Sequence, residues 1–183
     1  LVLGATGAGK SFFMALLLTQ LQKYLPYTFV FDLGGSYKSL SSLLGGAYLH
    51  IGPDAKGVSI NPFCLPPTKE NLQFLFCFVR VLIESSGHQL NTQDERDLYS
   101  QIQNLYEIDP SQRRLATLAN ILNRSLGDAL GKWVGSGQYG SIFDNAQDNL
   151  TFARFQAFDF EGRDKYPELL EPLLFYVLHR ASV

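Results

Sequence analysis

The 183-residue sequence has little cysteine, few charged residues and no long apolar run. Its two cysteines, Cys64 and Cys77, have no second pair beside them, so neither a zinc-site spacing nor a disulfide framework is present. Two reduced thiols in a reducing compartment are the simplest interpretation. The three histidines, His50, His88 and His179, are scattered and lack the spacing of metal ligands. These shortages exclude a protein held together by disulfides.

Charged residues make up 17% of the chain, and the formal net charge is -2. This balance argues against a strongly basic nucleic-acid binder and leaves room only for a local basic patch. The low share of charge also suggests that some surface is normally covered. The longest apolar runs, 12–18 and 72–83, are shorter than the roughly 20 residues of a membrane-spanning helix. The chain starts with Leu1 and ends in an apolar stripe, so we interpret it as a segment of a longer protein.

Hydrophobic spacing and turn residues predict alternating strands and helices, and then a helical block. Strands are expected at 1–3, 28–32, 47–51 and 151–160, and helices at 10–24, 36–44, 72–83, from 92, within 117–130 and from 167. Apolar residues nearly encircle the 10–24 segment, which predicts a helix that is buried on most sides. Ser36 is placed to cap the short helix that follows it. Thr92 and Glu95 form a capping-box pattern.

This order predicts an α/β fold in which a parallel sheet is interrupted by an all-helical insertion. We expect residues 1–67 to form a nucleotide-binding core and residues 68–149 to form the insertion. Residues 150–183 then return to the core with one strand and one helix.

The decisive motif is GATGAGKS at residues 4–11, which matches G-x-x-x-x-G-K-S between an apolar strand and a helix. Backbone N–H groups of such a loop wrap phosphate oxygens, and the following helix presents the positive end of its dipole. Lys10 would reach the β- and γ-phosphates of ATP, and the Ser11 hydroxyl would bind Mg²⁺. The expected nucleotide-binding residues are Gly4, Ala5, Thr6, Gly7, Ala8, Gly9, Lys10, Ser11 and Phe12. The alternative is a glycine-rich turn with an incidental Lys-Ser pair.

A nucleoside triphosphatase also needs carboxylates for the Mg²⁺ water shell and the attacking water. Asp32 ends an apolar strand and would emerge at the carboxyl edge of the sheet, where ligands of open α/β sheets bind. Asp159 and Glu161 end a later strand and point to one face. The alternative for each is a carboxylate that caps a following turn. We assign catalytic roles to Lys10 and Asp32.

Five segments carry a resemblance to a known family. They are the phosphate loop, FDLGGSY at 31–37, LGG at 44–46, INPF at 60–63 and FDFEG at 158–162. In this order and spacing they resemble the conjugal-transfer ATPases of the TrbE and TraC type, which are the motors of bacterial type IV secretion. The FtsK and HerA motors are more distant relatives of this group.

The resemblance implies a RecA-like P-loop core with a helical lid, and a hexamer that binds ATP and Mg²⁺. It also implies contact with secretion-channel proteins at the cytoplasmic face of the inner membrane. Lys10, Ser11 and Asp32 are the positions that carry over. The family's magnesium-binding Asp-Glu pair, glutamine motif and trans-acting arginine lie downstream of the last helix. Because the Asp159 strand precedes that magnesium-binding strand, the resemblance argues against catalytic roles for Asp159 and Glu161.

Two other functions remain open. A DNA-translocating motor of the FtsK and HerA superfamily would need basic residues along a pore, and the clustered candidates are Arg113, Arg114 and Arg124. A solvated helix face also explains these three arginines. A non-catalytic nucleotide sensor is the third hypothesis, although the intact Lys10 and Ser11 argue against it.

Overall fold

The computed structural model describes residues 2–3, 5, 7–51, 58–160 and 166–182. The chain divides into two compact units, which we describe separately. A core unit takes Leu1–Gly52 with Thr151–Lys165, and a helical unit takes Pro53–Leu150 with Tyr166–Val183. None of the helices in the described ranges is both long enough and apolar enough to cross a membrane.

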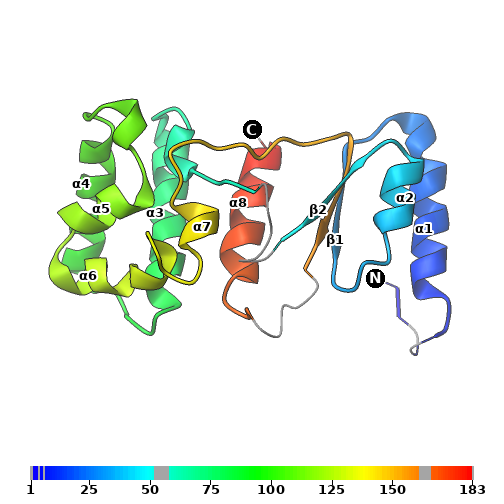
Figure 1. Cartoon of the computed structure of the whole chain (residues 1–183), viewed down its shortest axis with the longest axis horizontal. Coiled ribbons are helices and arrows are strands. Elements are labelled where there is room, and N and C mark those ends of the chain that lie inside the picture. Colours follow the sequence, from blue (N-terminus) through cyan, green and yellow to red (C-terminus); the bar gives the residue numbers. More distant parts are fainter. Residues whose placement is uncertain (1, 4, 6, 52–57, 161–165, 183) are drawn as a thin grey trace. The chain divides into compact units, whose positions relative to one another are not determined.

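The core unit is built on a three-stranded parallel sheet. Strands β1 (Thr28–Asp32), β3 (Phe155–Asp159) and β2 (Ala47–His50) lie side by side in that order. Helices α1 (Lys10–Leu21) and α2 (Lys38–Leu43) lie on one side of the sheet (Figure 1). The β-branched and aromatic side chains of β1 suit a half-buried pleated surface, whereas every residue of the central strand β3 is buried. The predicted parallel α/β arrangement is confirmed.

Two predictions near the start of the chain are wrong. Val2 and Leu3 belong to no strand and are exposed, because no described strand lies beside them to pair with, and Leu1 lies outside the described residues. Helix α1 is where the pattern places it, but none of its residues is buried. Phe12 is 76% exposed and Phe13 is 51% exposed. The apolar pattern predicted a helix correctly, but burial depends on tertiary neighbours, and α1 has its main described contacts with the short η1 turn (Gln22–Tyr24).

The helical unit has its own aromatic and aliphatic core. Its α-helices are α3 (Lys69–Glu84), α4 (Thr92–Leu105), α5 (Leu115–Ile121), α6 (Arg124–Ala129), α7 (Gly140–Phe143) and α8 (Leu170–Ser182), with 3-10 turns η2 (Pro62–Cys64), η3 (Pro110–Gln112) and η4 (Gly131–Trp133). Trp133 is fully buried, stacks on Tyr139 and donates its indole N–H to the Leu82 carbonyl at 3.0 Å. Phe78 and Phe143 extend this cluster with ring centroids 5.6 Å apart.

Helix α8 joins the helical unit in the structure. His179 of α8 stacks on Phe74 of α3 with ring centroids 3.7 Å apart, and its Nε2 lies 2.9 Å from Asn71 Oδ1. The sequence-based division grouped this helix with the returning strand in residues 150–183. In the structure, these contacts pair α8 with α3 within the helical unit.

The cap of α4 lies one residue before its predicted place. Asn91 is the N-cap, and its side chain accepts N–H bonds from Gln93 and Asp94. Asp94 in turn accepts from the Asn91 N–H, which completes a capping box. Thr92 and Glu95 therefore lie inside the helix, because an asparagine one residue earlier takes the same role.

Candidate functional site

The phosphate loop leads directly into α1. Gly7 and Gly9 have φ angles of 82° and 79°, in the left-handed region that favours glycine. The Ala8 N–H donates to the Ala5 carbonyl at 3.1 Å, which closes the turn. A Cβ placed on either glycine would meet no described atom within 4 Å, so the space around the turn is open. Of the expected nucleotide-binding residues, Gly4 and Thr6 lie outside the described residues.

Lys10 and Ser11 form the first turn of α1. Gly9 is the N-cap residue, so the N–H groups of this first turn have no capping side chain. Lys10 Nζ donates to the Ala5 carbonyl at 2.7 Å, which holds the ammonium group over the loop. Ser11 and Phe12 are exposed. Together these features give a cluster of positive and N–H donors that suits phosphate.

The same turn fits Mg²⁺ that arrives with a nucleotide. Within the described ranges, no group of three or more His, Cys, Asp or Glu side chains could hold a metal ion. Mg²⁺ usually keeps several waters and binds through one or two protein groups together with substrate phosphates. An exposed Ser11 hydroxyl beside the phosphate loop meets that requirement.

Asp32 is buried at the end of β1, and the turn that follows occupies its carboxylate. Oδ1 accepts the Gly34 N–H at 3.3 Å, and Oδ2 accepts the Tyr37 N–H at 2.9 Å. Burial and the neighbouring Asp32 raise the pKa of Tyr37. The predicted cap by Ser36 is wrong, because Tyr37 is the N-cap residue of α2 and the Asp32 carboxylate holds its N–H instead. These contacts support the turn-capping alternative, and a role of Asp32 in catalysis stays a prediction.

Asp159 ends β3 directly beside Asp32. The two residues are register partners, and so are Asp159 and His50. His50 Nδ1 lies 3.1 Å from Asp159 Oδ2, and the Asp159 side chain is only 5% exposed. Glu161, the second carboxylate of the predicted pair, lies outside the described residues. The sequence pattern alone did not find His50, because its role depends on β2 pairing with β3.

The three arginines considered for DNA differ in their local contacts. The Arg113 guanidinium donates to the carbonyls of Tyr106 and Ile108 at 2.8–3.0 Å, which ties it to its own loop. Arg124 lies 3.7 Å from Asp128 on the same helix and is almost fully exposed. Arg114 is the N-cap residue of α5. These positions match the solvated or structural interpretation.

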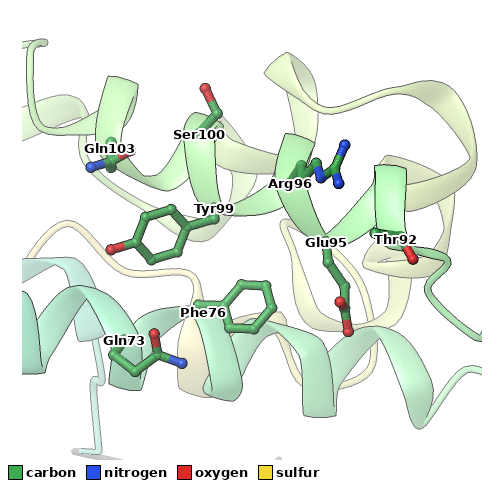
Figure 2. Close-up of a pocket in the computed structure, with 8 residues that line it drawn as sticks. All are labelled: Gln73, Phe76, Thr92, Glu95, Arg96, Tyr99, Ser100 and Gln103. Carbon is green, nitrogen blue, oxygen red and sulfur yellow. The ribbon is translucent and has the colours of Figure 1, made fainter.

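A separate groove of about 400 Å³ lies between α3 and α4 in the helical unit (Figure 2). Phe76 and Tyr99 project into it with ring centroids 6.0 Å apart, and polar side chains surround them. The groove contains no residue of the phosphate loop. It is therefore distinct from the predicted nucleotide site.

Comparisons with known proteins all match this chain to P-loop proteins or type IV secretion proteins. Residues 1–121 match the family described as the TraG P-loop domain. The chain is 31% identical to the type IV secretion system protein virB4 of Brucella suis biovar 1 over its whole length, and it covers 24% of that protein. It is 29% identical to the type IV secretion system protein PtlC of Bordetella pertussis over 99% of its length, and again covers 24% of the relative. It thus spans about a quarter of these relatives.

The fold also matches a solved structure. VirB4 of Thermoanaerobacter pseudethanolicus aligns with a TM-score of 0.69 and 18% identity over 97% of this chain and 54% of that one. At this level of identity the likeness concerns the fold. Together with the match to the TraG P-loop domain and the parallel sheet, it confirms the α/β P-loop NTPase class.

Proposed function

The chain belongs to the TraG P-loop domain family, and from this we propose that it is the ATP-binding segment of an ATPase that powers type IV secretion or conjugative transfer. The observation that carries the proposal is the glycine-rich turn before α1, with Lys10 held over it and Ser11 exposed beside it. The relatives named for type IV secretion support the biological setting.

The residues of this chain would hold MgATP through charge and N–H donors. The N–H groups of the loop and of the first turn of α1 bind phosphate oxygens, aided by the helix dipole. Lys10 exchanges its bond to the Ala5 carbonyl for the β- and γ-phosphates, and Ser11 completes the binding of Mg²⁺. Mg²⁺ held there would supply neutralisation of the charge on the transferred phosphoryl group.

Turnover requires more than this segment. Following the family resemblance, we assign the magnesium-binding Asp-Glu pair, the glutamine motif and the trans-acting arginine to the remainder of a full-length protein. A missing arginine alone lowers the rate by about 10³- to 10⁵-fold. The isolated chain should therefore bind ATP and hydrolyse it barely at all, and brisk turnover by the chain would contradict this assignment.

In the full-length protein we further propose a hexamer at the cytoplasmic face of the bacterial inner membrane, in contact with secretion-channel proteins. The DNA-translocating motor is the alternative. The local contacts of Arg113 and the exposed pairing of Arg124 give it less support.

The deciding experiment uses the full-length protein that carries this chain. Lys10→Ala should abolish binding of a fluorescent ATP analogue and ATP turnover while leaving the thermal melting curve unchanged, because Lys10 serves the loop and not the core. Lys23→Ala, in the η1 turn of the same unit, is the matched control and should bind normally. Turnover is measured with and without single- and double-stranded DNA.

Stimulation by DNA would favour the DNA motor. Lys10-dependent turnover that is indifferent to DNA would favour a secretion ATPase. Nucleotide binding that survives Lys10→Ala would overturn the proposed site, and binding without any turnover would indicate a nucleotide sensor.

A further inference from the structure

A pair of side chains, His50 and Asp159, lies at the carboxyl edge of the sheet and has no part in the phosphate binding proposed above. Asp32, Asp159 and His50 are the last residues of β1, β3 and β2, and they lie in register across the sheet. His50 Nδ1 is 3.1 Å from Asp159 Oδ2. An ionised Asp159 carboxylate can only accept, so the imidazole tautomer that satisfies it is the one with its proton on Nδ1. The bond therefore joins two strands that are distant in sequence.

Backbone bonds join the same three strands at the same edge. The Ile51 N–H donates to the Asp159 carbonyl at 2.9 Å, and the Phe160 N–H donates to the Asp32 carbonyl at 2.8 Å. The Asp32 side chain then holds the turn that follows β1. A continuous row of hydrogen bonds thus runs from His50 to that turn.

The burial of the pair is unequal. The Asp159 side chain is 5% exposed and that of His50 is 50% exposed. A buried carboxylate is costly unless it is paired and hydrogen-bonded, so each partner that it keeps lowers that cost. His50 is therefore more than an exposed strand end, because its ring nitrogen is one of the hydrogen-bond partners of a buried carboxylate.

The position of the pair in the chain adds a second observation. β2 and β3 are the strands from whose carboxyl ends the chain leaves the core unit for the helical unit, after Gly52 and after Lys165. Helix α1 begins at the end of the sheet where β1 finishes (Figure 1). Ligands of open α/β sheets bind at this edge.

We propose that His50 and Asp159 form a positioning pair for ATP turnover. The pair fixes the carboxyl edge of the sheet, and with it the turn held by Asp32, without contacting the nucleotide. This inference rests on the proposed ATPase function. Loss of the pair should slow the chemical step and leave nucleotide affinity unchanged, because the phosphate loop and Lys10 remain intact.

The kinetic test uses the full-length protein with His50→Ala, Asp159→Asn and the double variant. Each should lower kcat by about tenfold, while KM and the Kd of a fluorescent ATP analogue stay within about twofold. The double variant should lose less than the product of the two single effects, because each single variant already removes the bond between the two residues. His50→Gln, whose side-chain amide can also donate, should keep most of the activity. His88→Ala, another histidine near an aspartate, is the matched control.

Hydrogen exchange tests the positioning pair independently of ATP turnover, so its failure can be told apart from failure of the proposed ATPase function. Amide hydrogen exchange at Ile51 and Phe160 should accelerate by about tenfold in His50→Ala, because the edge opens more often. Unchanged exchange, additive effects of the two single variants, or an unchanged kcat in His50→Ala would each overturn the positioning pair. If instead Lys10→Ala left binding and turnover intact, the ATPase proposal would fail, and the exchange result would still decide whether the pair fixes the edge.

Discussion

Asp32 is the residue for which the structural and the catalytic interpretations predict different results. Asp32→Ala removes both acceptors for the turn, so we expect the free energy of unfolding to fall by about 1–2 kcal/mol in urea denaturation. Asp32→Asn keeps one oxygen and should lose less. Ser36→Ala is the control and should change nothing, since the Asp32 carboxylate and not Ser36 caps this turn.

The same variants test the catalytic role of Asp32. If Asp32 also holds the Mg²⁺ water shell, Asp32→Asn should weaken binding of ATP in the presence of Mg²⁺ but not in the presence of EDTA. Equal affinity for MgATP in wild type and variant would leave Asp32 with the structural role alone.

Tyr106 makes the free energy of unfolding depend on pH in the alkaline range. Burial raises its pKa to about 12 from the ordinary value of 10.0. Its hydroxyl donates to the Leu65 carbonyl at 2.9 Å. Between these two pH values the unfolded chain has lost the proton and the native chain retains it, so the contribution of Tyr106 to stability is complete below pH 10 and is lost as the pH rises toward 12.

We therefore expect Tyr106→Phe to be less stable than wild type by about 1 kcal/mol at neutral pH, because the hydrogen bond is lost. This difference should shrink as the pH rises through the window given above. Urea denaturation of both proteins at several pH values measures it. Tyr24→Phe, on a ring that is 71% exposed, is the control. A difference between Tyr106→Phe and wild type that does not change with pH would contradict the assignment.

Local motifs were predictable at the residue scale, and partners across strands were not. The phosphate loop and the start of α1 at Lys10 follow from sequence alone, since turn and helix signals act between near neighbours. The link between His50 and Asp159 spans 109 positions and exists only because β3 inserts between β1 and β2. Hydrophobic pattern does not encode that strand order.

The connection between α2 and β2 depends on Gly46. A Cβ on Gly46 would lie 2.3 Å from the Phe155 carbonyl oxygen on β3, so backbone would have to move. We expect Gly46→Ala to lower the free energy of unfolding by about 1–3 kcal/mol. Gly34→Ala is the matched control, because its Cβ would meet nothing within 4 Å, and it should stay within about 0.5 kcal/mol of wild type. Equal stability of the two variants would show that Gly46 does not set this contact.

Most helices and strands were predictable because the sequence patterns that specify them are local. Which elements pack against one another was not predictable from those patterns. The spacing that predicted a helix over 72–83 matches the buried face of α3 in part: Leu75, Val79, Leu82 and Ile83 are buried, whereas Leu72 and Phe76 are only partly buried. Leu98, Ile102 and Leu105 are the buried face of α4. The exposure of α1 was not predictable. A pattern of apolar residues indicates which face of a helix is suited to burial, but it does not indicate which neighbours cover that face.

At the scale of the whole molecule, the two units differ in how much apolar surface they expose. The helical unit has a core of fully buried large side chains, including Trp133 and Tyr176. The core unit exposes large apolar side chains along α1 and the segment after it. The exposed residues are Phe12, Phe13, Leu16, Leu17, Leu21, Tyr24, Leu25 and Tyr27. A helix that is apolar on all sides is normally covered, and a contiguous exposed patch favours association.

The chain on its own should therefore self-associate and bind a hydrophobic dye through α1. We expect the apparent mass in analytical ultracentrifugation to rise with concentration, and we expect Leu16→Gln with Leu17→Gln to reduce both this rise and the dye fluorescence. Leu43→Gln, at a residue that is 77% exposed on α2, is the matched control and should change neither. Because Leu16 and Leu17 lie beyond the first turn of α1, ATP binding should survive the double substitution. If the chain stays monomeric and binds no dye, this prediction is wrong, and α1 must be covered in solution by contacts other than those described above.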